Sequence, residues 1–262
     1  MPRARRSGRF VKLMAMLSDL DLAQALADLA DELALARFGA ADLRVETKPD
    51  LSPVTETDKA IEQALRERIA AERPDDAVLG EEGGASGEGG RRWILDPIDG
   101  TRNYSRGIPV FATQMALEVD GDVKLGLVSA PALGHRWWAE RGKGAFRDGK
   151  QIHVSQVSEL ENAVISSELS EGVEGLRPLA KRAWHMRSFG DFWQHMLVAE
   201  GCVDVAVDPV VKIWDCAPLK LIVEEAGGKF TDLAGRAVID GGSGVSSNGL
   251  LHLEVLVALG MR

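Results

Sequence analysis

The segment from residue 96 to residue 101 reads DPIDGT and contains two aspartates, Asp96 and Asp99, three positions apart. The apolar residues 93–95 before it predict a buried strand, and the proline and glycine within it predict that the strand stops in a tight turn. Such a turn can direct two carboxylates and a peptide carbonyl at one point, which is the oxygen cluster that a hard divalent cation needs. Aspartate, proline and glycine are also ordinary turn formers, so this stretch taken alone favours a surface turn, and only the rest of the chain favours the metal site.

Three more carboxylates stand where helices or strands are expected to begin or end. Asp58 comes three residues after Thr55 at the start of a predicted helix, Glu81 follows a short strand at residues 78–79, and Asp215 begins another predicted helix. Because open sheets build ligand sites at their strand ends, Glu81 and Asp96 are expected to lie near each other. Each position also has an ordinary explanation, since Asp58 fits the acid of a helix capping box. Glu81 fits a solvated loop charge.

Composition excludes several classes of protein. The chain has 262 residues, of which 45% are hydrophobic and 27% charged, as in an ordinary globular protein. The net charge of -9 argues against a nucleic-acid surface. Its only cysteines, Cys202 and Cys216, suggest no disulfide framework and are compatible with a reducing, cytoplasmic compartment. No apolar run is long enough for a membrane span.

The chain is expected to divide into three parts. Residues 1–17 are rich in arginine and form either a disordered basic arm or a stretch before the true start. Residues 18–154 would be an α+β half that carries most of the carboxylates, and residues 155–262 an α/β half that completes the site. A first helix should begin at the N-cap Ser18 and stop at Gly39.

The region from residue 111 to residue 154 changes to a period of two, which predicts an antiparallel sheet with helices on one face. Two Asp-Gly pairs, at residues 120–121 and 148–149, are typical of hairpin turns. Trp137 and Trp138 should face opposite sides of this sheet. Before it, residues 48–58 are expected to be a loop because of their two prolines, and residues 83–90 a mobile glycine-rich loop.

The second half mixes strands and helices. Strands are expected at residues 163–166, 203–207, 230 and 245–246, and helices at 176–184, through Glu200, after Asp215 and at 250–259. Residues 186–191 are expected to be a polar turn.

Four of these segments together resemble the inositol monophosphatase superfamily of Mg2+-dependent, lithium-sensitive phosphatases. The segment 96–101 followed by Asn103 is similar to the family's first signature, and residues 214–218 with 225–228 are similar to its second. Residues 80–82 resemble the upstream glutamate motif, and residues 53–58 resemble the valine-threonine-x-x-aspartate motif. The four segments occur in the family's order over residues 18–262.

The resemblance implies a fold and a set of roles. The fold would be α/β, a five-layer αβαβα sandwich with two sheets between helix layers. The ligands of two or three Mg2+ ions would be Glu81, Asp96, the carbonyl of Ile98, Asp99 and Asp215. The catalytic groups would be Thr101, Asp58 and Glu81, with Thr101 held by Asp58 so that it orients a water for in-line attack on phosphorus. Substrate contacts would come from Glu81, Ile98, Asp99, Gly100, Thr101, Arg187, Asp191, Asp208 and Asp215. Lys48 and Glu82 would orient the metal-binding carboxylates.

The residue after Gly190 separates substrates within the superfamily. Inositol-type members often have a small neutral residue there, whereas this chain has Asp191 and so resembles the bacterial and plant histidinol-phosphatase branch. An acidic side chain at the pocket mouth could pair with the amine or imidazole of histidinol phosphate. A helix cap is the alternative role for Asp191.

The predicted activity is therefore hydrolysis of L-histidinol phosphate, a small phosphate monoester, in histidine biosynthesis. Inositol-1-monophosphatase and fructose-1,6-bisphosphatase are the alternatives within the class. A catalytically inactive metal- or phosphate-binding regulator is the alternative outside it. The family habit also implies a homodimer, with neither a nucleic-acid nor a membrane partner.

Overall fold

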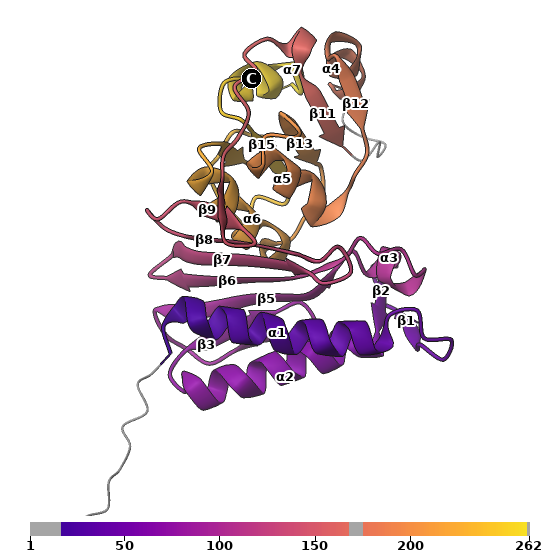
Figure 1. Ribbon diagram of the computed structural model, residues 1–262, viewed down its shortest axis with the longest axis vertical. Helices are drawn as coiled ribbons and strands as arrows, with labels where there is room; N and C mark the ends of the chain where they lie inside the picture. The colour runs from indigo at the N-terminus through magenta and orange to yellow at the C-terminus, as the bar shows by residue number, and fades with distance from the viewer. Residues whose placement is uncertain (1–16, 168–174, 261–262) are drawn as a thin grey trace, which may run out of the picture.

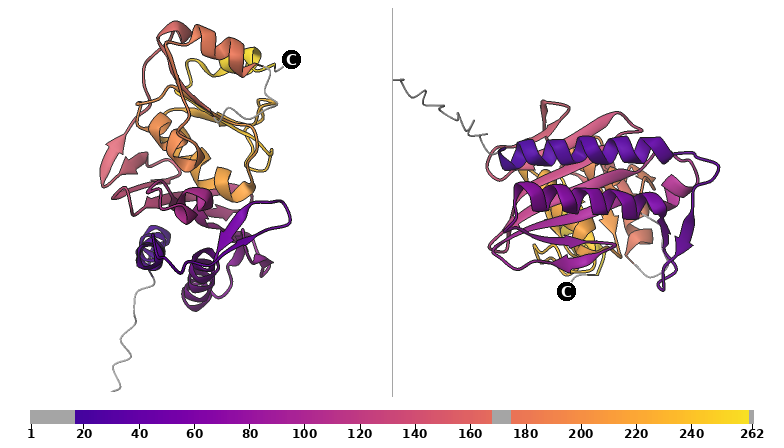
Figure 2. Two further views of the ribbon diagram at one scale, coloured as in Figure 1. Left: turned by 90° about the vertical axis from the view of Figure 1, so that its right-hand side faces the viewer. Right: turned by 90° about the horizontal axis from the view of Figure 1, so that it is seen from below.

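The computed structural model describes residues 17–167 and 175–260, and residues 1–16 of the expected basic arm lie outside them. Within the described residues the chain forms helices above, below and between two main sheets (Figures 1 and 2). The helices are α1 (Asp19–Arg37), α2 (Glu56–Glu72), α3 (Thr101–Ser105), η1 (Leu160–Asn162), α4 (Leu176–Arg182), α5 (Asp191–Ala199), α6 (Ile213–Glu225) and α7 (His252–Ala258).

The first main sheet has eight strands in the order β10-β9-β8-β7-β6-β5-β3-β4, all antiparallel to their neighbours except β3 and β5, which are parallel. Its strands are β3 (Ala77–Gly80), β4 (Gly84–Ser86), β5 (Arg91–Asp99), β6 (Ala112–Val119), β7 (Asp122–Ala130), β8 (His135–Glu140), β9 (Ala145–Arg147) and β10 (Lys150–Ile152). A separate two-stranded hairpin pairs β1 (Val45–Thr47) with β2 (Pro53–Thr55).

The second main sheet has five strands in the order β12-β11-β13-β15-β14. They are β11 (Val164–Ser167), β12 (His185–Arg187), β13 (Val205–Asp208), β14 (Lys229–Thr231) and β15 (Gly244–Ser247). The chain passes from the first sheet to the second between Ile152 and Val164. The division at residues 154 and 155 remains a prediction.

Three apolar cores hold five layers together, and the middle one spans two interfaces, because it also contains Ala206 and Phe230 of the second sheet. One core joins α1 and α2 to the first sheet through residues such as Leu26, Leu65 and Met115. The middle core joins that sheet to α5 and α6, and the third joins the second sheet to α4 and α7. Figure 1 shows the same succession from α2 at the bottom to α7 at the top. The predicted αβαβα sandwich is confirmed.

The expectation that helices cover one face of the first sheet is wrong, because α6 packs on the face opposite α1 and α2. Gly126 of β7 makes this close packing possible, since a Cβ there would lie 2.8 Å from the carbonyl oxygen of Pro218 in α6. The two adjacent tryptophans do face opposite sides, Trp137 in the middle core and Trp138 against the α1 and α2 core.

Three segments expected to be irregular contain short strands. β2 lies within the proline-rich segment 48–58, β4 within the glycine-rich segment 83–90, and β12 covers the start of the expected turn 186–191. Each of these strands is only three residues long, which is too short for an alternating pattern of apolar and polar residues to predict it. Each is defined by its pairing with another strand, β2 with β1, β4 with β3 and β12 with β11. The period-two region was expected to run to residue 154, but its last strand, β10, ends at Ile152; the β9–β10 hairpin turns at residues 148–149, where the Asp-Gly pair predicted a turn.

The helix starts and hairpin turns agree better with the sequence. Ser18 caps α1, where its hydroxyl accepts the Asp21 N–H at 3.1 Å. Asp120 and Gly121 both have positive φ, at 53° and 83°, as the tight β6–β7 turn requires.

A buried hydrogen-bond chain runs through His252, which is 5% exposed. Gly249 donates its N–H to Ser247 Oγ, whose hydroxyl lies 2.8 Å from His252 Nδ1. On the other side, Thr231 Oγ1 lies 3.0 Å from His252 Nε2 and donates its own proton to the carbonyl of Asp232. Because the Thr231 proton is already used, Nε2 must carry the ring hydrogen and Nδ1 must accept from Ser247. This arrangement requires a neutral imidazole.

Stability is therefore expected to fall in mild acid because of His252. Burial lowers the pKa of His252 from 6.5 to about 4. Between these values the unfolded chain binds a proton that the folded chain does not, so this contribution is complete above pH 6.5 and is lost as pH falls toward 4. The loss amounts to about 3 kcal/mol. Urea unfolding of the wild type and of His252→Gln at pH 7, 5.5 and 4.5 should show their difference in unfolding free energy shrinking with acid. A constant difference would contradict the assignment.

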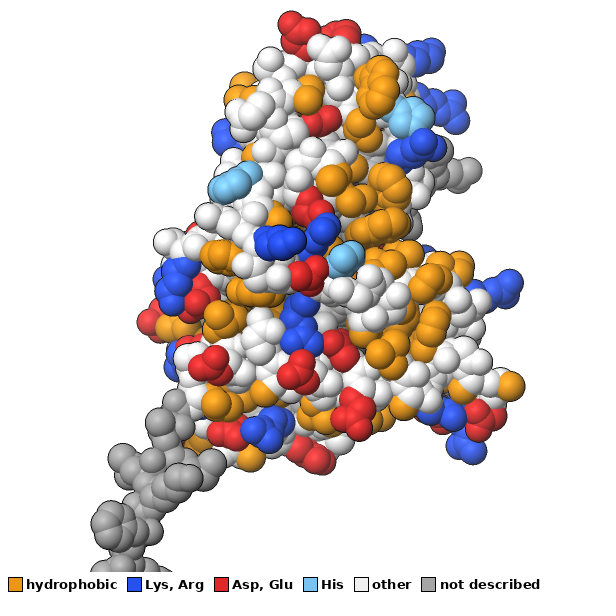
Figure 3. All heavy atoms as spheres, in the orientation of Figure 1, with side chains coloured by type: hydrophobic (Ala, Val, Ile, Leu, Met, Phe, Trp, Pro, Cys, Tyr) orange, Lys and Arg blue, Asp and Glu red, His pale blue; other side chains and the backbone are white. Residues whose placement is uncertain are grey.

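No helix in residues 17–167 and 175–260 is long and apolar enough to cross a membrane. On the face drawn in Figure 3, lysine and arginine side chains are interspersed with aspartate and glutamate and do not form one basic patch.

Candidate active site

The sequence suggested that the strand stops at Pro97, but β5 continues through Pro97 to Asp99. The pairing with β6 is irregular between Asp96 and Asp99, which marks a bulge where the missing N–H of proline is tolerated. In a regular strand, residues three apart point to opposite faces. The bulge cancels that alternation, and carboxylate oxygens of Asp96 and Asp99 come within 4.8 Å of each other and of one from Asp215.

Gly100 turns the chain from β5 into the short helix α3. Its φ of +82° and the 2.9 Å that would separate a Cβ from the Val110 carbonyl oxygen both require glycine. Thr101 is thereby the first residue of α3. Its Oγ1 lies 2.8 Å from the Ile98 carbonyl oxygen and 3.1 Å from Asp58 Oδ1.

Asp58 has both of the roles that its sequence context allows. Its Oδ2 accepts the Thr55 N–H at 2.9 Å and completes the capping box of α2, while Oδ1 faces Thr101. Burial raises the pKa of Asp58 despite these hydrogen bonds. The capping box fixes the carboxylate that in turn holds the Thr101 hydroxyl.

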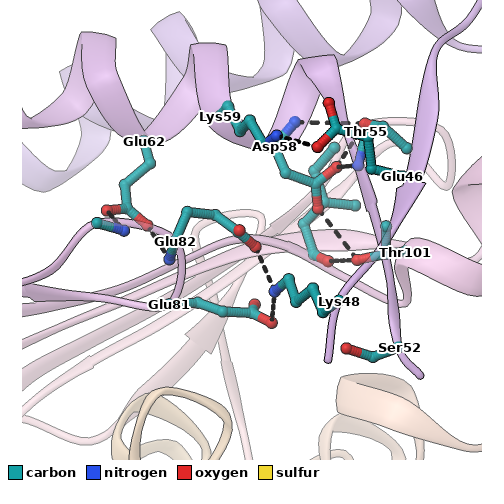
Figure 4. Close-up of polar contacts among 12 residues, drawn as sticks. Glu46, Lys48, Ser52, Thr55, Asp58, Lys59, Glu62, Glu81, Glu82 and Thr101 are labelled. Carbon is teal, nitrogen blue, oxygen red and sulfur yellow. Dashed lines mark hydrogen bonds and ion pairs between the residues drawn. The ribbon is translucent and has the colours of Figure 1, made fainter. Parts of the chain in front are cut away.

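Lys48 comes from the β1–β2 hairpin and joins the two glutamates that follow β3 (Figure 4). Its Nζ lies 2.7 Å from Glu81 Oε1 and 2.6 Å from Glu82 Oε1. Burial opposes the charge of Lys48, but the hydrogen bonds to the two glutamates outweigh it and raise the pKa. Lys48 is therefore a cation fixed between Glu81 and Glu82.

The sequence suggested that Asp215 begins its helix, but Asp215 is the third residue of α6. Its Oδ2 accepts the Lys212 N–H at 2.7 Å, so helix capping orients this carboxylate as it orients Asp58. Burial, with the nearby Glu81, raises the pKa of Asp215 to about 6.

The acidic cluster, formed by Asp96, Asp99 and Asp215, is electrostatically unfavourable without a cation. Burial and the neighbouring Glu81, Asp99 and Asp215 raise the pKa of Asp96 well above its usual range. Burial and the charges of Asp191 and Asp215 do the same to Asp99. Asp96 Oδ1 is buried and has no hydrogen-bond partner. An unpaired buried carboxylate oxygen among like charges is costly, and a divalent cation would relieve that cost. These residues therefore fit a metal.

A cavity of about 520 Å³ contains the cluster. Its charged lining has six acidic residues, Asp50, Glu81, Asp96, Asp99, Asp191 and Asp215, and three basic ones, Lys48, Arg102 and Lys212. Ile98, Gly100 and Thr101 also line it. An anionic substrate would meet an excess of negative charge here unless metal ions offset it.

Asp191 lies in this cavity and is not the N-cap of α5. Gly190 takes the cap position, and Asp191 follows it with a φ of +48°. Asn103 donates to Asp191 Oδ2 at 3.1 Å. The alternative role of Asp191 as a helix cap is therefore wrong.

Two expected substrate residues are not among those that line the cavity. Arg187 is exposed at the end of β12. Asp208 is buried and accepts hydrogen bonds from Gln194 and His195 of α5. The substrate contacts expected of Arg187 and Asp208 remain predictions.

The cavity also includes residues to which the sequence assigned no role. Asn103 joins the Val110 carbonyl to Asp191, and Lys212 precedes the helix of Asp215. Their closeness in sequence to Thr101 and Asp215 was the available signal.

Comparison with known proteins identifies the family. The family model described as "Inositol monophosphatase family" matches residues 16–259. The chain belongs to this family. Its members are metal-dependent phosphatases of small phosphate monoesters, so the chain is a phosphoric monoester hydrolase, as predicted.

Individual relatives cover nearly all of the chain. A histidinol-phosphatase of Mycobacterium tuberculosis is 53% identical, covering 92% of this chain and 97% of the relative. A histidinol-phosphatase of Streptomyces coelicolor is 48% identical, covering 94% and 98%. Among solved structures, the Thermotoga maritima IMPase superposes with a TM-score of 0.86 at 34% identity, covering 93% of this chain and 97% of the other. The predicted family and fold are confirmed.

Proposed function

We propose that this protein hydrolyses L-histidinol phosphate to L-histidinol and phosphate with the help of Mg2+. The observation that carries the choice of substrate is the place of Asp191, a carboxylate in the same cavity as Asp99 and Thr101. The similarity to two histidinol-phosphatases over almost the whole chain supports it.

The carboxylates of Glu81, Asp96, Asp99 and Asp215, with the Ile98 carbonyl, would hold two or three Mg2+ ions. Bound Mg2+ lowers the pKa of water and neutralises phosphoryl oxygens. Small hard ions take oxygen ligands from carboxylates and keep open positions for water and phosphate, which suits this donor set.

Thr101 and Asp58 would orient the attacking water. If the Thr101 hydroxyl donates to Asp58 Oδ1, the lone pairs of Oγ1 are free to accept a hydrogen bond from that water. Asp58 cannot swing away, because its other oxygen is held by the cap of α2. Lys48 and Glu82 would keep Glu81 in place, since Lys48 bonds to both glutamates.

Asp191 would recognise the cationic end of the substrate. Histidinol phosphate has an amine and an imidazole that can both be protonated, and a carboxylate can form a charge-assisted hydrogen bond with either. A neutral polyol such as inositol gains less from this charge.

A second candidate, inositol-1-monophosphatase or fructose-1,6-bisphosphatase activity, is favoured by one relative. The fructose-1,6-bisphosphatase/inositol-1-monophosphatase of Thermotoga maritima is 36% identical over 242 residues. Phosphate release from histidinol phosphate, inositol-1-phosphate and fructose-1,6-bisphosphate, with Mg2+ and with EDTA controls, separates the two functions. A higher kcat/KM for either of the last two would replace the proposed substrate.

Asp191→Asn is expected to lower kcat/KM for histidinol phosphate by about 10- to 100-fold, the cost of one charge-assisted hydrogen bond. Asparagine is the appropriate substitute because it tolerates the positive φ of this position, whereas alanine would be strained. Turnover of inositol-1-phosphate, measured beside it, should change by less than about threefold. An equal loss on both substrates would mean that Asp191 supports the site without selecting the substrate.

Two expectations stay predictions. A homodimer would be checked by sedimentation of the purified protein, and a cytoplasmic location by fractionation of the producing cells.

A further inference from the structure

Glu62 of α2 is a buried carboxylate outside the cavity that contains the acidic cluster, and its side chain is only 3% exposed. Its Oε2 accepts the Glu82 N–H at 2.7 Å, and its Oε1 accepts the Gly83 N–H at 2.8 Å. Both donors belong to the turn that follows β3 and carries Glu81. Figure 4 shows Glu62 reaching from the helix to this turn, beside Glu82.

We propose that Glu62 is a positioning residue for metal binding, which acts by fixing the turn at residues 81–83. The inference rests on the proposed metal site, because the turn presents Glu81 to it. Glu62 is neither one of the residues that line the cavity nor one of the three aspartates of the acidic cluster.

The glycines of this turn are fitted to Glu62. A Cβ at Gly80 would lie 2.3 Å from Glu62 Oε1, and a Cβ at Gly83 would lie 2.7 Å from the same atom. Neither glycine has the positive φ that would by itself call for glycine. Close approach of the backbone to the Glu62 carboxylate therefore explains both positions.

Arg66, one helical turn after Glu62, completes a clamp on the strand that follows. Its Nε lies 2.7 Å from Glu62 Oε1, and its Nη1 donates to Ser86 Oγ at 2.9 Å in β4. Its Nη2 donates to the Gly84 carbonyl. Arg66 thus bonds both to Glu62 and to β4, so α2 holds the β3–β4 connection at two points.

Hydrogen bonds, more than packing, must hold this turn. A second cavity of about 680 Å³ is bordered by Glu62, Arg66, Glu82 and Gly83. On that side the turn faces this cavity. Losing the Glu62 acceptors would therefore leave two N–H groups and the turn itself free to move.

α2 thus sets two parts of the site at once. Asp58 and Glu62 are four residues apart and lie on one face of the helix. Asp58 holds the Thr101 hydroxyl, and Glu62 holds the turn of Glu81. The helix is a common support for the group that would orient water and for a group that would bind metal.

The test is titration of the purified full chain with Mg2+ alone in a calorimeter. Glu62→Gln is expected to raise the dissociation constant about tenfold or more, as loss of an outer support of a metal ligand does. The matched control is Glu67→Gln on the exposed face of the same helix, where the carboxylate accepts a hydrogen bond from Gln63. Its constant should stay within about twofold of the wild type. At saturating Mg2+, kcat of Glu62→Gln should recover to within about threefold of the wild type.

Gly83→Ala is the second variant, because it leaves Glu62 and Arg66 in place and pushes the turn away from them. It should raise the Mg2+ dissociation constant in the same direction even if Glu62→Gln fails to fold. A folded variant of either kind that binds Mg2+ like the wild type would overturn the inference and leave the proposed function intact. A wild type that binds no Mg2+ would overturn both, whereas a different preferred substrate would affect neither measurement.

Discussion

Replacing Asp99 with asparagine is expected to lower kcat/KM by about 10^4-fold, or about 5 kcal/mol of transition-state stabilisation. The substitution keeps the shape of the side chain and an oxygen that can accept the Phe192 N–H, which now lies 2.6 Å from Asp99 Oδ2. It removes a negative charge that a bound cation would need. Steady-state phosphate release at several Mg2+ concentrations would measure the loss.

The same substitution is expected to stabilise the metal-free protein. Burial and the charges of Asp191 and Asp215 raise the pKa of Asp99, so ionised Asp99 is unfavourable in the absence of a cation. Thermal unfolding should therefore show a higher Tm for Asp99→Asn than for the wild type in EDTA, and a smaller increase on adding Mg2+. This opposite effect on stability separates lost chemistry from misfolding.

Asp120→Asn is the matched control for Asp99→Asn. Asp120 lies in the β6–β7 turn with a φ of 53°, where asparagine is as well accommodated as aspartate. Its activity should equal that of the wild type. If Asp99→Asn retained wild-type activity, the phosphatase reaction would have to use another site. The role of this cavity would then be metal or phosphate binding without catalysis, which is the regulatory alternative named above.

The acidic residues of the site could be found from sequence because each lies at the beginning or end of a predicted helix or strand. Asp58 and Asp215 are both the third residue of a helix and accept the N–H of its N-cap residue, and Glu81 follows a short strand. Such end positions are visible without knowledge of the fold. The order of the four motifs then indicated the family, and the family indicated how the ends converge.

Other features depend on contacts that no local pattern contains. The bulge that turns Asp96 and Asp99 to one side requires the pairing with β6. The approach of α6 to the second face of the sheet requires Gly126 beneath Pro218. Asp208 bonds to two side chains of α5, a helix that follows a different strand, and the sequence showed neither of these partners. Its expected substrate contact stays a prediction.

Thr101→Val is expected to lower kcat by about 10^3-fold while KM changes little, because the substitution removes a hydroxyl that acts on the attacking water. Valine has nearly the same shape as threonine, and Thr101 is only half-buried, so the fold should be unaffected. The hydroxyl has one proton and two acceptors within reach, the Ile98 carbonyl at 2.8 Å and Asp58 at 3.1 Å. If metal binding engages the Ile98 carbonyl, the proton is directed to Asp58 and the hydroxyl oxygen becomes an acceptor for water.

Thr101→Ser distinguishes this role of the hydroxyl from simple packing. Serine keeps Oγ and loses only the methyl group, so its kcat should stay within about tenfold of the wild type. If serine and valine were equally inactive, the methyl contact and not the hydroxyl would be what the reaction needs. Asp58→Asn is a less direct test of the same pair, because Asp58 also accepts the Thr55 N–H and its change would disturb the start of α2. The hydroxyl of Thr101 is thus the point at which the water-orienting role can be removed without removing the helix that supports it.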